Sequence, residues 1–260
     1  APLLVLTVVF GPRGASSQVD YASLRQLADT ADLKRHVEFF ASRGSRVVGY
    51  PGARESALYI QQQFSEVGLH DIEVHTYDVS VPVEKGGEMR VAGFEPIALY
   101  GLWPNLVHTS TLPDGGIDAP LIYIGSGELS EMNGMQVDGA VALMDFNSGD
   151  NWLNAAHLGA RGIIFLEPES TVYLEGERKF LTMPLDVPRF WIDADVGEQL
   201  RRALATGDQQ PVAHLEYRMD WERESAWNIM GRIPGHDPLL KKDVIVLESY
   251  YDAMSVVPGL

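Results

Sequence analysis

The sequence predicts an α/β protein, and three observations support this class. Hydrophobic residues make up 45% and charged residues 22% of the 260-residue chain, which is enough apolar material for a packed core. Segments with helical periodicity alternate with short runs of branched apolar residues. The run VIVL at 244–247 is continuously apolar, as in a strand that is buried on both faces of a sheet.

The composition excludes several classes of site. The chain contains no cysteine, which excludes disulfides, thiolate zinc sites and cysteine nucleophiles. Its formal net charge is −16, so a polyanion is repelled and nucleic acid is not an expected partner. An anionic membrane surface is disfavoured for the same reason.

The first 17 residues predict the remnant of a signal peptide or of a membrane anchor. The run LLVLTVVF at Leu3–Phe10 is followed by the small residues at 14–17. A run of this length falls far short of the ~20 residues that span a bilayer. A buried strand is the alternative interpretation. The signal interpretation predicts a secreted, periplasmic or membrane-anchored protein, with membrane contact only through such an anchor.

The first hundred residues predict a helix, a loop, a second helix and a strand, in that order. Helical spacing extends over 21–41, and the Gly-rich stretch RGSRVVGYPG at 43–52 has no helical period. A second helix is expected over 53–67, where apolar residues form one stripe and Gly68 is placed to end it. The alternation in IEVHTYDVSVPV at 72–83 predicts a strand.

From about Gly101 the chain becomes rich in Pro and Gly, with short apolar runs between turns. Branched residues predict short strands, and intervening segments predict two helices. The expected strands are 121–124, 140–144, 162–166, 215–219, 227–233 and 244–247, and the expected helices are 151–159 and 196–205.

Three stretches in order resemble one protein family. Ser45–Leu69 is similar to the N-terminal loop and helix of zinc aminopeptidases with paired metals. The block from Gly116 to Leu204 looks like a protease-associated domain, with Val137-Asp138-Gly139 before AVALM and GARGII at 159–164. Asn228–Met254 resembles the strand, PG-x-D-P turn and strand that deliver the first metal-binding motif. The family includes aminopeptidases, glutamate carboxypeptidase and the non-catalytic transferrin receptor.

The resemblance implies a partial α/β zinc-peptidase domain with a mixed sheet and an inserted, strand-rich α+β protease-associated domain. Residues 18–100 would form the N-terminal part of the peptidase domain and 101–215 the inserted domain, which is expected to fold by itself. Residues 216–260 would begin the peptidase core sheet, which this chain does not complete.

The resemblance also places the first motif at Tyr250-Tyr251-Asp252. Since ligands sit beyond the carboxyl ends of strands in open α/β sheets, these residues would lie at the rim of strand 244–249. The family has His-x-Asp here, in which His binds metal and Asp orients it. Asp252 matches that second position, whereas Tyr250 replaces the His, and a neutral phenol is a poor zinc ligand.

One alternative ligand is Glu248, which shares a strand face with Tyr250 and Asp252. It is displaced by about 7 Å along a strand, so it would serve only an altered site, and a structural ion pair is the competing interpretation. The family's remaining ligands lie beyond the first motif. We therefore expect zinc in an active full-length parent, and no metal ligand within this chain.

Other catalytic patterns are missing from the sequence. No H-E-x-x-H motif, phosphate loop, dinucleotide fingerprint or G-x-S-x-G elbow is present. The seven histidines, none of which share a helical i, i+4 spacing, are interpreted as structural or exposed: His36, His70, His75, His108, His157, His214 and His236.

Two functions remain open. The first is a metallo-exopeptidase-like hydrolase of the aminopeptidase class, which acts on peptides or amino-acid derivatives in the full-length parent. The second is a catalytically inactive relative with a binding or structural role, because the His of the first motif is replaced.

Overall fold

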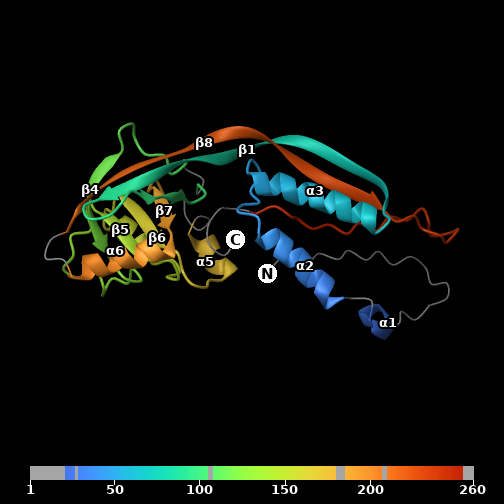
Figure 1. Cartoon of the computed structure of the whole chain (residues 1–260), viewed down its shortest axis with the longest axis horizontal. Coiled ribbons are helices and arrows are strands. Elements are labelled where there is room, and N and C mark those ends of the chain that lie inside the picture. Colours follow the sequence, from blue (N-terminus) through green and yellow to red (C-terminus); the bar gives the residue numbers. More distant parts are fainter. Residues whose placement is uncertain (1–20, 27–28, 105–107, 180–184, 207–209, 254–260) are drawn as a thin grey trace. The chain divides into compact units, whose positions relative to one another are not determined.

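The computed structural model describes residues 21–26, 29–104, 108–179, 185–206 and 210–253, which divide into two compact units. Unit 1 contains Ala1–Tyr77 and Ser225–Asp252, and unit 2 contains Asp78–Glu224 and Ala253–Leu260. The chain therefore leaves unit 1, forms unit 2 and returns (Figure 1). Among the described residues, no helix has the length and apolar character needed to cross a membrane.

The elements confirm the α/β class. The helices are α1 (Tyr21–Gln26), α2 (Thr30–Ala41), α3 (Pro51–Glu66), α4 (Trp152–His157), α5 (Tyr173–Arg178) and α6 (Ala194–Thr206). The strands are β1 (His70–Val91), β2 (Ile97–Ala98), β3 (Tyr100–Gly101), β4 (Ile117–Tyr123), β5 (Val141–Asp145), β6 (Gly162–Leu166), β7 (Arg189–Ile192) and β8 (Val212–Arg232).

The strands form one mixed sheet in the order β2-β1-β8-β4-β5-β6-β7-β3. The four strands β4, β5, β6 and β7 run parallel, with Leu143 opposite Ile164 in the centre. The pairs β1–β2, β4–β8 and β3–β7 are antiparallel. The helix between β5 and β6 is the crossover that a parallel pair requires.

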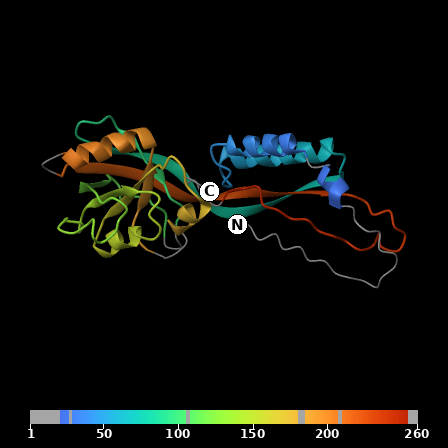
Figure 2. The same ribbon diagram turned by 90° about the horizontal axis from the view of Figure 1, so that it is seen from below.

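Local sequence signals explain the helices of unit 1. The predicted helix over 21–41 is interrupted, because the Asp29 side chain accepts a hydrogen bond from the Ala31 N–H at 2.8 Å and starts α2 anew. Helix α3 confirms the prediction for 53–67, begins with Pro51 in its first turn, and is followed by Gly68 at φ 77°. In Figure 2 both α2 and α3 lie on one side of the paired strands of this unit.

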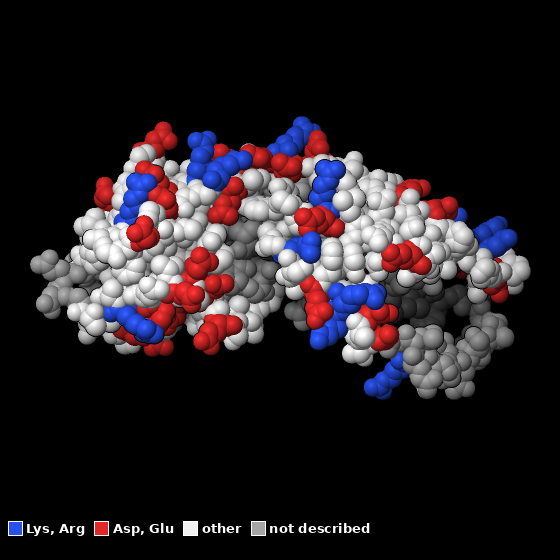
Figure 3. All heavy atoms as spheres, viewed as in Figure 1, with Lys and Arg blue, Asp and Glu red and all other residues white. Residues whose placement is uncertain are grey.

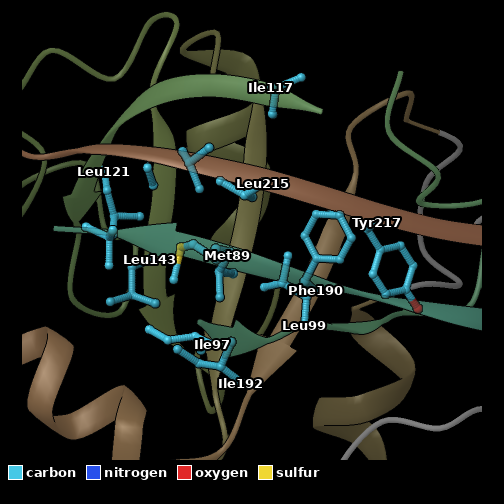
Figure 4. Packing of buried hydrophobic residues seen from close by; sticks show 14 of the residues in the cluster. Met89, Ile97, Leu99, Ile117, Leu121, Leu143, Phe190, Ile192, Leu215 and Tyr217 are labelled. Atoms are coloured by element: carbon cyan, nitrogen blue, oxygen red, sulfur yellow. The ribbon is translucent and has the colours of Figure 1, made fainter. Parts of the chain in front are cut away.

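Unit 2 contains the hydrophobic core, in two clusters that use opposite faces of its sheet. One cluster joins β1, β8 and the parallel strands to Leu200 of α6, and Figure 4 shows Met89, Leu143 and Phe190 converging in it. The other joins Ile163 and neighbouring strand residues to Trp152 of α4. Because both faces of β5 and β6 are covered, their residues form the continuous apolar runs that the sequence shows.

Unit 1 has no comparable core among the described residues. Only a few of its hydrophobic residues are buried, namely Val47, Ala53, Ala57 and Ala226. Apolar side chains of its helices and of 233–247 are exposed instead: Leu33, Val37, Leu58, Val67, Ile233, Leu239 and Leu240. Unit 1 is therefore much less well packed than unit 2.

One strand prediction is wrong. Residues 244–247 have no regular secondary structure, and their side chains are 75–83% exposed, because no described strand lies beside them to accept their hydrogen bonds. The strands expected at 215–219 and 227–233 are confirmed up to Arg232, but they belong to one continuous strand, β8. The charged stretch between them, DWERESA, continues as a strand because β1 pairs alongside it.

The net negative charge is distributed unevenly along the chain. Residues 78–224 contain 24 acidic and 10 basic side chains, whereas the rest of the chain has 12 and 10. Figure 3 shows acidic groups spread over the visible face of unit 2 with few basic groups between them. Unit 2 alone would therefore repel a polyanion, and the absence of a nucleic-acid partner stays a prediction.

Candidate functional site

The segment that would carry the first metal motif lies in unit 1. Arg46, from the Gly-rich loop, donates from Nε to the Tyr251 carbonyl at 3.0 Å and from a terminal nitrogen to the Phe40 carbonyl at 3.1 Å. Tyr251 donates its hydroxyl to the carbonyl of Trp227 on β8 at 2.8 Å. The loop at 43–50 and residue Tyr251 are thus held together.

Local burial sets the protonation of this segment. Burial raises the pKa of Tyr251 to about 12, and the adjacent Asp252 carboxylate adds to the effect. Tyr251 is therefore a neutral hydrogen-bond donor at physiological pH. Burial also raises the pKa of Asp252 above its ordinary value, although its own backbone N–H and the nearby Arg46 oppose the shift.

The residues present do not fit a zinc ion. Tyr250 is 63% exposed, and Glu248 is exposed as well. Within the part of the chain that the structure describes, no three His, Asp or Glu side chains come together in a way that could hold a metal. The shared strand face that would align Glu248 with Tyr250 and Asp252 is a wrong expectation, because 248–252 do not form a strand. The role of Asp252 stays a prediction.

The described histidines with side-chain partners lie in other places. His214 bridges two carboxylates on the surface of unit 2, at 3.0 Å from Asp118 and 3.2 Å from Glu216, which raise its pKa. His36 lies 2.7 Å from the Tyr59 hydroxyl between α2 and α3. These contacts agree with the interpretation of both histidines as structural.

Sequence reasoning missed a buried charged cluster in unit 2. Lys179 is 0% exposed, and its Nζ donates to the Gly149 carbonyl at 2.7 Å, Glu175 at 3.1 Å and Ser148 at 3.3 Å. The same Nζ lies 5.4 Å from the ring centres of two core phenylalanines. Burial lowers the pKa of Lys179, although Glu175 opposes this.

Arg189 is the second buried cation of this cluster. It is 2% exposed, donates to the Lys179 carbonyl and lies 5.0 Å from the Trp152 ring, and burial lowers its pKa to about 10. Its Nε has no partner among the described residues. The stretch LEGERK gave no signal for this arrangement, because alternating charges are typical of an exposed helix.

Comparisons with known proteins identify solved structures of similar fold. No protein-family model matches the sequence, and no curated protein matches it. Among solved structures, a zinc aminopeptidase from Bacillus subtilis aligns over 78% of this chain at 20% identity and a TM-score of 0.51. A structure described as a Peptidase M28 precursor from Shewanella amazonensis SB2B aligns over 80% at 12% identity and a TM-score of 0.51.

The alignments cover 47% and 51% of those two proteins, so this chain spans about half of their length. Identities at this level show the fold and not the activity. The predicted class is confirmed at that level: the chain has a mixed-sheet α/β fold that is similar to the folds of these two proteins over the part that it spans.

Proposed function

We propose that this chain is the N-terminal part of a metallo-exopeptidase-like hydrolase of the aminopeptidase class. The observation that carries the proposal is the likeness of its fold to the zinc aminopeptidase of Bacillus subtilis. Peptides or amino-acid derivatives are the proposed substrates. A zinc-bound water would supply the nucleophile in the complete protein, and its ligands are proposed to lie beyond residue 260.

The packing of unit 1 supports this proposal. Its apolar helix residues and the run at 244–247 are exposed, although exposing so much apolar surface is unfavourable. Further strands of a peptidase sheet would cover these groups and would pair with 244–247. The same strands would place Tyr250 and Asp252 at the sheet rim, where Asp252 is proposed to orient a neighbouring ligand.

The inserted part is proposed to be a protease-associated domain. Its predicted range, 101–215, lies inside the continuous stretch Asp78–Glu224 of unit 2, which has its own core. In this proposal the domain helps to select the substrate. The proposed signal peptide or anchor at 1–17 lies outside the described residues and makes the protein extracytoplasmic.

A second candidate function is favoured by one observation. Tyr250 occupies the position of the family's metal-binding His and is exposed, and the described residues contain no group of three His, Asp or Glu side chains that could hold a metal. A complete protein that retained this replacement without a rearranged site would be a catalytically inactive binding relative. The two candidate functions predict different hydrolytic activities and different metal contents for the complete protein, and both quantities can be measured.

The first test compares residues 1–260 with the complete product of the reading frame that contains them. The 260-residue chain is expected to retain no zinc pair after dialysis and to release no chromophore from leucine p-nitroanilide. The complete protein is expected to hydrolyse this substrate and to lose activity on chelation. Two tightly held metals in the 260-residue chain would contradict the account, and a folded but inactive complete protein would favour the second candidate.

A variant of the complete protein tests whether Tyr250 is a metal ligand. Tyr250→Phe removes only the hydroxyl, so metal content and hydrolysis are expected to stay nearly unchanged if Tyr250 is not a ligand. Loss of metal with an unchanged circular dichroism spectrum would instead identify Tyr250 as a ligand.

A further inference from the structure

Arg189 is a buried cation of unit 2 that has no counter-charge among the described residues. It is 2% exposed and lies on β7 opposite Ile163 of β6, on the sheet face that carries the core cluster with Trp152. Burial lowers its pKa to about 10, so the guanidinium stays charged at neutral pH. Within the described part of the chain, the Glu175 carboxylate pairs with Lys179, and no carboxylate pairs with Arg189.

The contacts of the Arg189 side chain supply no full negative charge. One terminal nitrogen donates to the Lys179 carbonyl, and the guanidinium carbon lies 5.0 Å from the centre of the Trp152 ring. A carbonyl oxygen and an aromatic face attract a cation, but neither replaces the solvation that a buried guanidinium loses. Nε of Arg189 is buried and has no hydrogen-bond partner among the described residues, which is unfavourable for a donor.

A second unsatisfied donor lies on the same face of β7. Among the described residues, three buried side-chain nitrogen or oxygen atoms lack a hydrogen-bond partner, and two of them are Nε of Arg189 and Nε1 of Trp191. Trp191 is two residues further along the strand, opposite Phe165, and therefore shares the face of Arg189. This part of the core thus contains more N–H donors and more positive charge than its described acceptors can satisfy.

The sheet holds Arg189 in this position. Strand β7 lies between β6 and β3, and the Arg189 carbonyl accepts hydrogen bonds from the Leu102 N–H at 3.0 Å and from the Ser110 hydroxyl at 3.1 Å. The guanidinium cannot reach water without disrupting these contacts, so a counter-charge has to enter the core instead. Because Arg189 is 2% exposed, the occupant has to be small, as a halide ion is.

We propose that the core of unit 2 binds one small inorganic anion, chloride, at Nε of Arg189. The ion neutralises the guanidinium and accepts its free N–H in a charge-assisted hydrogen bond. A buried water is the competing occupant, which would accept the N–H without supplying charge. The inference concerns the stability of unit 2 and does not rest on the proposed function, so its failure leaves the tests of hydrolysis and metal content unaffected.

The first test is the chloride dependence of unfolding. The whole chain is unfolded in urea while chloride is replaced by gluconate, which is too large for a buried site, at constant ionic strength. Four of the five tryptophans lie within 78–224, so their fluorescence follows unit 2. Each tenfold rise in chloride above its Kd is expected to lower the unfolding constant about tenfold, as for one ion that binds only the folded state. Equal stability in both salts would overturn the proposal and favour the buried water.

Two variants locate the chloride effect. Arg189→Met retains a long side chain but removes the charge and Nε, so its unfolding is expected to be independent of chloride. Arg202→Met is the matched control, because the Arg202 side chain on α6 is 72% exposed, and it is expected to keep the chloride dependence of the parent chain. An Arg189→Met chain that kept this dependence would show that chloride binds elsewhere and would overturn the proposal.

Bromide locates the ion in the unmodified chain, which keeps the proposal testable if Arg189→Met does not fold. Crystals of the chain grown with bromide in place of chloride are expected to show an anomalous scattering peak within hydrogen-bond distance of Nε of Arg189. Bromide peaks at the protein surface alone, with an ordered Arg189 side chain, would contradict the proposed site. Density at Nε without anomalous signal would contradict it as well, because it would identify a water.

Discussion

Glu175→Gln is expected to destabilise unit 2 by about 3 kcal/mol, because it removes the carboxylate that compensates a buried ammonium group. Glu175 accepts hydrogen bonds from Lys179 Nζ at 3.1 Å and from the Gly149 N–H at 2.9 Å. Lys179 is fully buried, so water cannot replace the lost charge. Urea unfolding of the chain, followed by the signal of its tryptophans, measures the loss.

Two further variants separate charge from packing. Glu169→Gln makes the same chemical change at an exposed position nearby and is expected to alter stability by less than about 0.5 kcal/mol. Lys179→Met in the Glu175→Gln background removes the uncompensated cation and is expected to recover most of the loss. A Glu175→Gln protein as stable as the parent would show that the buried pair contributes nothing.

The Lys179–Glu175 pair is also expected to make the stability of unit 2 depend on pH. Burial raises the pKa of Glu175, but the Gly149 N–H and Lys179 outweigh it, so the pKa lies below the ordinary value of 4.5. Since the folded pKa is depressed, the stabilisation is present above about pH 4.5 and is lost as pH falls through the folded pKa. Glu175→Gln should therefore weaken the acid dependence of unfolding.

Gly52→Ala is expected to open the loop at 43–50 and to release the segment that it holds. A Cβ on Gly52 would lie 2.9 Å from the Ser45 carbonyl carbon, closer still to its oxygen, and 3.1 Å from Cβ of Arg43. The obstacle is backbone, which cannot rotate away, so we expect a cost of about 3 kcal/mol. Arg46 would then lose its position against the Tyr251 carbonyl.

Trypsin cleavage after Arg43 and Arg46 reports this opening. A cost of about 3 kcal/mol corresponds to about 100-fold faster cleavage when the open population limits the rate. Gly44→Ala in the same loop is the matched control, because its Cβ would meet no atom within 4 Å. Equal cleavage rates for the two variants would show that the loop does not need the glycine.

Sequence patterns predicted two kinds of element. The first depends only on residues close to it in the sequence, and the second is buried on both faces by apolar residues. Helix α3 and its terminal Gly68 follow from one apolar stripe and one stop signal. Strands β5 and β6 follow from continuous apolar runs, because both of their faces are buried. The general fold class could therefore be predicted before any contact was known.

Other features depend on partners that are distant in the sequence. The middle of β8 is charged and extends as a strand only because β1 lies beside it. The buried Lys179 is stabilised by Glu175 one helical turn away and by Gly149 from another loop, which no periodicity predicts. For 244–247 the error was the reverse, since an apolar run predicts burial without supplying a neighbouring strand. The site predictions at Tyr250 and Asp252 depend on such missing neighbours.

The central proposal is that residues 78–224 form a self-contained unit within the chain. The most direct test is hydrogen exchange of residues 78–224 produced alone, compared with the same residues in the whole chain. The account predicts equal protection of the β4, β5 and β6 amides in both proteins, because the two core clusters lie within 78–224. Loss of that protection in the isolated unit would contradict it.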